Sequence, residues 1–235
     1  MKPEICIPTT GRTLAEITGE ALKIAQAAPD LIEFRADYFK DAVFDNIFAA
    51  ISAIRRANPK TPIIFTFRSK KEGGVSHTPK KTRARILKAV INGRLCQICD
   101  IEQSLGTNTV SSLTARAKQK GVLTIISYHN FTRTPNLKKI AALWQNAARY
   151  NPDYIKIAAM AKRGADAALL WHAISALSRK SRIKPVVVAM GEEGKITRAA
   201  GTAITFAPLF AKGAPGQIPY FNLKEIFSLL YGGNN

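Results

Sequence analysis

The feature that most constrains this chain is a regular alternation of short apolar runs with longer amphipathic runs, which continues from one end to the other. The short runs are rich in β-branched and aromatic residues and have apolar side chains on both faces, as strands buried on both sides do. The expected strands are residues 4–8, 31–35, 62–68, 97–102, 122–128, 153–158, 184–190 and 201–207. Sustained strand-helix alternation predicts a parallel sheet with right-handed crossovers.

The amphipathic runs are the expected helices, and no Pro/Ser-rich linker divides the series. They are residues 14–28, 42–57, 80–91, 110–120, 137–150, 163–179 and 223–230, with a short turn at 193–199. About eight such β/α units indicate an α/β fold, a single-domain (β/α)8 TIM barrel over residues 1–235. The main alternative is a doubly wound sheet, but no Gly-rich dinucleotide fingerprint follows the first strand.

The formal net charge of +19 raises the alternative of a nucleic-acid-binding protein. The basic residues are, however, spread along the chain, and the densest run, 80–85, continues as an amphipathic helix without aromatic residues on which bases could stack. We therefore interpret this run as a solvated helix face and expect no nucleic-acid partner. A positive field would also steer a small anionic substrate towards a cleft.

No apolar run approaches the roughly 20 residues that cross a bilayer, and Glu4 and Pro8 interrupt the first residues too soon for a signal peptide. A cytoplasmic location without a membrane partner is the expectation. The three cysteines, Cys6, Cys96 and Cys99, form no disulfide framework. Cys96 and Cys99 are expected to be buried thiols on opposite faces of a strand, and without a second pair they predict no metal site.

One charged residue, Lys156, lies in the middle of the apolar strand expected at 153–158. Burying an ammonium group costs several kcal/mol unless the group is paired or loses its proton. A lysine that is deprotonated near neutral pH is a nucleophile able to form a Schiff base with a carbonyl. The structural alternative is a lysine that extends its amine to the strand end or pairs with a carboxylate.

Further polar residues fall at the carboxyl ends of the expected strands or in the loops after them, where barrel enzymes place their chemistry. They are Glu33, Arg35, Arg68, Glu72, Asp100, Glu102, His129, Arg198 and Gln217. An amine, an imidazole and several guanidinium groups suit proton abstraction next to an iminium and binding of a carboxylate. His129 is the histidine placed for catalysis, although a loop-capping role is the alternative, whereas His77 and His172 are interpreted as surface or structural residues.

Five short motifs occur in the order found in type I 3-dehydroquinate dehydratases, and the chain resembles this family over nearly its whole length. The motifs are Glu33-Phe-Arg-Ala-Asp37, Thr66-Phe-Arg-Ser-Lys-Lys-Glu-Gly-Gly74, Ser127-Tyr-His129, Lys156-Ile-Ala and Ala214-Pro-Gly-Gln217. The resemblance implies a barrel, usually a homodimer, that dehydrates 3-dehydroquinate to 3-dehydroshikimate in the shikimate pathway. It also implies that no metal or organic cofactor is needed.

By the same resemblance, Lys156 would form the imine with the ketone of the substrate. His129 would remove a proton from the neighbouring carbon and then protonate the departing hydroxyl, in a syn elimination, while Glu72 would orient and polarise His129. Arg198 and Gln217 would hold the region of the substrate carboxylate. Glu33, Arg35 and Arg68 would contact the substrate hydroxyls or support those contacts.

Two positions depart from the family pattern. Gly213 stands where the family usually has a serine, and Pro8 stands where some relatives have one. Each change removes a hydrogen bond to substrate worth on the order of 1 kcal/mol unless water replaces it. The segment 208–221 is expected to act as an active-site lid.

Two other functions remain open at this point. A class I aldolase would need a phosphate site after the seventh and eighth strands, which Gly191 and Gly194 leave open. The second open function is that of a barrel protein that binds a ligand but does not catalyse a reaction.

Overall fold

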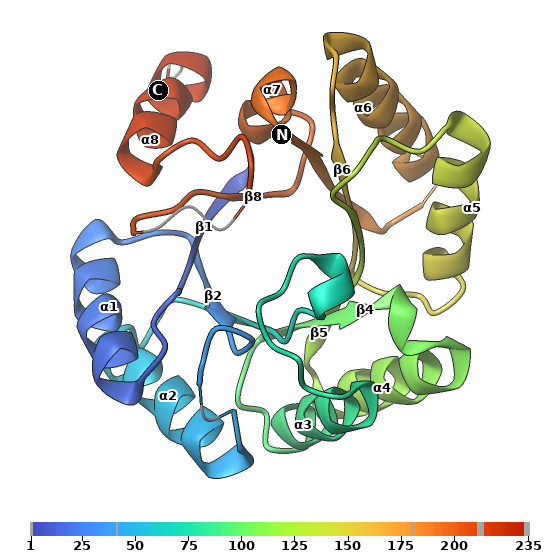
Figure 1. The fold of residues 1–235 in the computed structure, drawn as a ribbon. Coiled ribbons are helices and arrows are strands. Elements are labelled where there is room, and N and C mark those ends of the chain that lie inside the picture. The colour runs from blue at the N-terminus through green and yellow to red at the C-terminus, as the bar shows by residue number, and fades with distance from the viewer. Residues whose placement is uncertain (1, 41, 180, 211–213, 233–235) are drawn as a thin grey trace. The chain divides into compact units, whose positions relative to one another are not determined.

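The structure, a computed structural model, describes residues 2–40, 42–179, 181–210 and 214–232. Strands and helices alternate along the chain (Figure 1). The strands belong to one sheet in the order β7-β6-β5-β4-β3-β2-β1-β8. Two compact units are distinguished, one formed by residues 8–126 and the other by residues 1–7 with 127–235. The expectation of a single domain stays a prediction.

In the unit 8–126, parallel strands form the interior and the helices between them pack in neighbouring pairs, α1 with α2 and α3 with α4 (Figure 1). Its elements are α1 (Leu14–Ala27), β2 (Leu31–Arg35), α2 (Phe44–Ala57), β3 (Ile63–Thr66), α3 (Lys80–Asn92), β4 (Ile98–Glu102) and α4 (Thr107–Lys120). Short 3-10 turns η1 and η2 occupy Lys70–Glu72 and Gln103–Leu105. Phe34 of β2 is opposite Phe65 of β3, which is opposite Cys99 of β4.

Burial explains why this unit forms as the sequence pattern predicts. In α2, Ile47, Ala50, Ile51 and Ile54 follow helical spacing, and all four are buried. Each large apolar side chain removed from water contributes about 1.5–3 kcal/mol, so this face holds the helix in place. The fully buried Phe34 of β2 belongs to the same core.

In the unit of residues 1–7 and 127–235, strand pairing is again parallel. Its elements are β1 (Glu4–Pro8), the end of β5 (Leu123–Asn130), α5 (Leu137–Ala148), β6 (Tyr154–Met160), α6 (Gly164–Ser178), β7 (Lys184–Met190), η3 (Glu192–Gly194), α7 (Ile196–Ala199), β8 (Ile204–Phe206) and α8 (Tyr220–Tyr231). Strand β6 pairs with β7 from Tyr154 opposite Lys184 to Met160 opposite Met190. Cys6 of β1 is opposite Phe206 of β8.

Two strand ends differ from the sequence-based expectation and shift candidate residues. Strand β3 ends at Thr66, so Arg68 lies in the following loop rather than closing the strand. There the backbone N–H of Arg68 donates to the Asp37 carboxylate, at 3.4 Å, instead of to a neighbouring strand. Strand β5 continues to Asn130, so His129 lies within it.

The cysteines are free and buried, as expected, but the expected opposite orientation of Cys96 and Cys99 is wrong. Cys96 precedes β4, outside the strand alternation, and its side chain forms a hydrogen bond with that of Cys99. This hydrogen bond and burial raise the pKa of Cys99 well above its ordinary value. A thiol with a raised pKa is a weak nucleophile, which agrees with a packing role.

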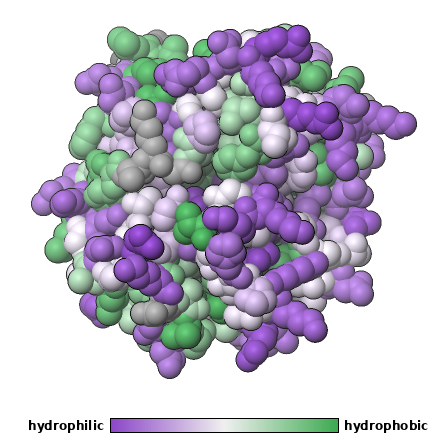
Figure 2. All heavy atoms as spheres, in the orientation of Figure 1, coloured by the Kyte–Doolittle hydropathy of each residue, from purple (hydrophilic) through white to green (hydrophobic). Residues whose placement is uncertain are grey.

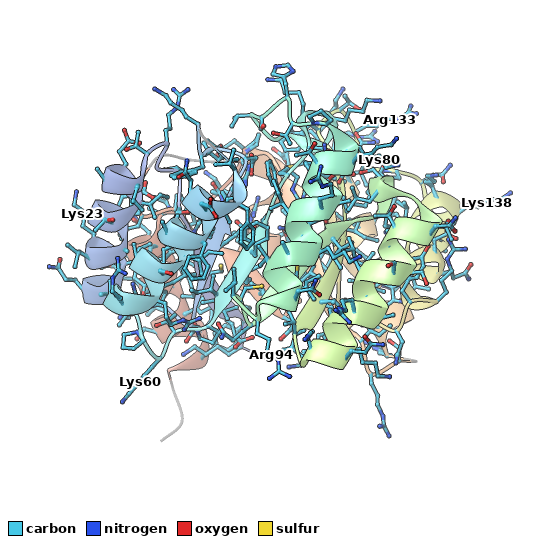
Figure 3. The ribbon with its side chains drawn as sticks, turned by 90° about the horizontal axis from the view of Figure 1, so that it is seen from below. Lys23, Lys60, Lys80, Arg94, Arg133 and Lys138 are labelled. Carbon is cyan, nitrogen blue, oxygen red and sulfur yellow. The ribbon has the colours of Figure 1, made fainter. Side chains whose placement is uncertain are left out.

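The basic side chains point outwards from many elements. Lys23, Lys60, Arg94 and Lys138 all extend away from the ribbon in Figure 3. Hydrophilic and hydrophobic residues alternate over the face shown in Figure 2. The high charge is therefore dispersed, as the sequence predicts. No helix within the described ranges is long and apolar enough to span a membrane.

Candidate functional site

The eight residues to which the family resemblance assigns a role are divided equally between the two units. Glu33, Arg35, Arg68 and Glu72 belong to the unit 8–126, whereas His129, Lys156, Arg198 and Gln217 belong to the other. Six of the eight are buried, and Arg35 and His129 have intermediate exposure. Each group of four is described below within its own unit.

Arg68 is the centre of a buried ion-pair network in the unit 8–126. Its Nη2 atom lies 2.8 Å from Oδ2 of Asp100, and its Nη1 atom lies 3.3 Å from Oε1 of Glu102. Burial alone would lower the pKa of the Arg68 guanidinium, but these carboxylates and Glu72 outweigh burial and raise it. Arg68 is therefore a permanent cation held in one position.

Glu72 ends the 3-10 turn η1 that follows β3, and only 6% of its surface is exposed. Burial and the negative charge of Glu102 raise the pKa of Glu72 to about 7, against the opposing effect of Arg68. A carboxyl group with this pKa exchanges a proton in the pH range where a histidine does. Glu72 is thus suited to acid-base chemistry near neutral pH.

Replacing Glu72 by glutamine is expected to stabilise the protein above pH 7. The folded state keeps a proton up to a pKa of about 7, whereas an unfolded glutamate releases it near 4.5. The ionised Glu72 therefore lowers stability progressively as the pH rises from about 4.5 to 7, and a neutral amide removes this loss. Thermal melts should show a Glu72→Gln gain in Tm that is larger at pH 8 than at pH 5.

The control is Glu225→Gln, which neutralises an exposed glutamate of α8. Its Tm difference from the native protein should not change over this pH range. A Glu72→Gln difference that stayed constant with pH would contradict the raised pKa.

Arg35 and Glu33 close β2 and are held by neighbours of the same unit. Arg35 forms a bidentate pair with Asp37, with both N–O distances at 2.8 Å. Glu33 accepts a hydrogen bond of 2.7 Å from the hydroxyl of Thr66. Burial lowers the pKa of Arg35, but Asp37 and Glu33 raise it by more. The arginine thus stays charged and is fixed by its carboxylate partner.

Lys156 lies in the middle of β6, as the sequence predicts, with only 6% of its surface exposed. Its Nζ atom lies 3.8 Å from the centroid of the Phe206 ring in β8. The aromatic face shields the amine from water on that side and orients it. His129 lies on β5, the neighbour of β6 in the sheet.

Arg198 and Gln217 converge on the loop after β8. Nη2 of Arg198 donates to the backbone carbonyl of Pro215 at 3.2 Å, and the Gln217 side chain accepts from the backbone N–H of Ala214 at 3.1 Å. Burial lowers the pKa of Arg198 to about 10. Its Nε atom is buried without a hydrogen-bond partner among the described residues. A buried donor without a partner is suited to receive an anionic ligand.

This loop needs glycine at position 216. Gly216 has a φ of 72°, and a Cβ there would lie 2.1 Å from the carbonyl oxygen of Gly191. Gly191, after β7, donates its N–H to the Pro215 carbonyl. The loop that carries Gln217 is therefore packed against the loop that precedes Arg198. Gly213, and with it part of the lid expected at 208–221, lies outside the described residues.

Sequence reasoning missed several residues that hold the site. Asp37 fixes Arg35 and also accepts from the backbone of Val75, and Phe206 covers the Lys156 amine. The opposite charges of Arg35 and Asp37, two residues apart in sequence, offered a signal for their pair, although Asp37 lies in the turn after β2. Phe206 is fifty residues from Lys156 in sequence, and no local pattern connects the two.

A metal site is not assembled by the residues that the structure describes. No group of three or more His, Cys, Asp or Glu side chains in these ranges could hold a metal ion. The two remaining histidines, His77 and His172, are exposed, in agreement with the sequence-based interpretation.

Comparison with protein families gives one match, the model described as type I 3-dehydroquinase, over residues 5–234. A 3-dehydroquinate dehydratase from a Geobacillus strain is 34% identical over 236 residues, which cover 97% of this chain and 90% of the relative. One from Klebsiella pneumoniae is 32% identical over 232 residues, covering 96% and 92%.

Solved structures show the same likeness in three dimensions. The crystal structure of 3-dehydroquinate dehydratase from Geobacillus kaustophilus has a TM-score of 0.93 and 30% identity, covering 99% of this chain and 93% of its own. A type I enzyme from Clostridium difficile, solved with covalently modified comenic acid, has a TM-score of 0.93 and 28% identity, with 99% and 94% covered. These likenesses confirm the (β/α)8 barrel class.

Proposed function

Because the chain belongs to the type I 3-dehydroquinase family, a family of hydro-lyases that convert 3-dehydroquinate in the shikimate pathway, we propose that its reaction passes through a Schiff base on Lys156. The observation that carries the proposal is the amine itself, buried in the middle of a strand and lying over an aromatic ring. An amine held this way has lost the hydration that protects a surface lysine. The covalently modified ligand in the relative from Clostridium difficile also supports covalent chemistry.

In the proposed reaction, the Lys156 amine attacks the ketone carbon, and loss of water leaves a protonated imine. His129 removes a proton from the adjacent carbon, and the C–H electrons move into the iminium, which becomes an enamine. The enamine then expels the hydroxyl on the next carbon, which leaves as water with the proton from His129. Hydrolysis of the remaining imine releases the product and restores Lys156.

Glu72 is proposed to orient His129 and to stabilise the imidazolium form that exists between the two proton transfers. A carboxylate performs this role in its ionised form, as in other carboxylate-histidine pairs. Because burial and Glu102 raise the pKa of Glu72 to about 7, the ionised fraction falls as the pH drops through neutrality. The proposal therefore places the acid limb of kcat/KM, which reports the pKa values of the free enzyme, near pH 7.

Two groups of residues are proposed to bind the substrate, and they differ in whether their polar atoms already have partners in the protein. Arg198 is the proposed partner of the substrate carboxylate, because it has a buried donor still without a partner among the described residues. With a pKa of about 10 it stays charged at neutral pH. Gln217 is proposed to support this contact. Glu33, Arg35 and Arg68 are proposed to contact the substrate hydroxyls or to support those contacts, since each is already held by a neighbour.

The experiment that tests the proposal is borohydride reduction in the presence of 3-dehydroquinate, followed by peptide mass mapping. The expected result is an adduct of substrate or product mass on the peptide that contains Lys156, and none when the ketone is omitted. Turnover without any lysine adduct, or an adduct at another lysine, would exclude the assigned nucleophile. The homodimer and the cytoplasmic location stay predictions.

A further inference from the structure

Arg83 is a buried cation that the proposed reaction does not use. Only 8% of its surface is exposed, on α3, which begins at Lys80 (Figure 3). Nη1 donates to the carbonyl of Thr78 at 3.0 Å, and Nη2 lies 3.4 Å from Oε2 of Glu102. Its Nε atom is buried and has no hydrogen-bond partner among the described residues. An incompletely satisfied buried cation lowers the stability of a fold. Its presence therefore calls for a reason other than stability.

Helix stability does not account for Arg83. The first turn of α3 already carries Lys80 and Lys81 and has no acidic residue. Cations near a helix N-terminus are opposed by the helix dipole, so a further one at Arg83, two positions after Lys81, adds to the repulsion. The reason for a guanidinium here must therefore lie in what it contacts, the Thr78 carbonyl and, as its charged partner, Glu102.

Glu102, at the end of β4, is the point at which three segments meet. Its Oε1 accepts from the backbone N–H of Ser69 at 2.7 Å and faces Arg68. Its Oε2 faces Arg83 and accepts from the hydroxyl of Ser104 at 3.2 Å. The one carboxylate thus connects the loop after β3, the helix α3 and the turn after β4.

The charges around Glu72 show why this connection matters. Asp100 and Glu102 face it with negative charge and Arg68 with positive charge, and the Ser104 hydroxyl, which also contacts Glu102, lies within hydrogen-bond reach of it. Lys70 and Lys71, beside it in the turn η1, are exposed and screened by water. Arg83 is the second buried cation of the cluster, and it neutralises Glu102. Without Arg83, Asp100 and Glu102 would face Glu72 with Arg68 as their sole buried counter-ion among the described residues.

We propose that Arg83 is a positioning residue of the active site, which holds Glu102 in place and offsets its charge, and so determines the pH at which Glu72 becomes the carboxylate that turnover needs. The role in turnover rests on the proposed function. The titration of Glu72 itself does not, and the two can be measured separately.

The first measurement is a ¹³C NMR titration of Glu72 in the free enzyme, with the signal assigned by its absence in Glu72→Gln. The side-chain carboxyl is expected to titrate at a pH higher by about one unit in Arg83→Gln, because a nearby cation has been removed. Arg83→Lys keeps the charge and should bring the midpoint back most of the way. Arg85→Gln removes the same charge from an exposed position two residues further along α3 and should leave the midpoint unchanged.

The second measurement is the pH profile of kcat/KM, which reports the pKa values of the free enzyme. A shift of about one unit leaves about one tenth of Glu72 ionised at pH 7, so Arg83→Gln should lose roughly five-fold in kcat/KM there and recover most of it near pH 9. Structural damage would lower kcat/KM at every pH instead. Equal Glu72 midpoints in the native protein and in Arg83→Gln would overturn the proposal even if the enzyme were inactive.

If Arg83→Gln does not fold, the comparison moves to Glu102→Gln and the double variant Arg83→Gln/Glu102→Gln, which removes both members of the buried pair together. The double variant is expected to titrate Glu72 at a higher pH than Glu102→Gln alone. Identical midpoints in these two variants would also overturn the proposal. An absence of dehydratase activity in the native protein, by contrast, would overturn the proposed function and leave the titration result standing.

Discussion

Lys156→Ala is expected to lower kcat by roughly four orders of magnitude or more, since removing the nucleophile removes the covalent route itself. The side chain is buried within β6, and its amine lies over Phe206, so no neighbouring solvent-exposed lysine can take its position. The same variant should give no adduct on borohydride reduction with 3-dehydroquinate. The measurement is steady-state turnover, monitored by the absorbance of the conjugated product.

The matched control is Lys184→Ala. Lys184 is also a strand lysine, but it lies at the exposed amino end of β7, opposite Tyr154. It should keep turnover within about two-fold of the native value, because surface substitutions away from a site have small effects. Turnover in Lys156→Ala within ten-fold of the native protein would show that the imine is not formed on this residue.

His129→Ala is expected to lower kcat by roughly 10²- to 10⁴-fold, the usual contribution of a positioned acid-base group. Imine formation needs only Lys156 and the ketone, so the covalent adduct should still form. Because the following proton transfer is blocked, the adduct should accumulate and be visible by intact-protein mass spectrometry during turnover. This combination of slow turnover and accumulated adduct distinguishes His129 from Lys156.

The control for the histidine is His172→Ala, which changes an exposed residue of α6 and should leave both turnover and adduct level unchanged. Near-normal turnover in His129→Ala would show that another group transfers the proton. Loss of the adduct in His129→Ala would instead place the histidine in imine formation, and the order of steps proposed above would have to change.

The alternation of apolar and amphipathic runs was sufficient to predict the strands, the helices and the barrel class. Burial follows from such periodicity because a strand places successive side chains on opposite faces and a helix repeats its face every three to four residues. Lys156 was found in the same way, as a lysine in the middle of an apolar strand run. The expected end of β3 was less accurate, because a hydrogen bond to a side chain remote in sequence decides where this strand stops. The Asp37 carboxylate does this at Arg68.

The sequence by itself thus predicted which residues would carry the proposed chemistry and which elements hold them, since both predictions depend on local pattern and motif order. The tertiary structure alone decided the electrostatic environment of these residues, that is, how deeply they are buried and which charged groups lie beside them. Glu72 has a pKa of about 7 because it is buried beside Glu102, thirty residues further along the chain. Arg83, on the helix α3, pairs with Glu102 and so offsets the negative charge beside Glu72. Electrostatic interactions act over distances in space between segments remote in sequence, and burial strengthens them, so no local pattern can predict them.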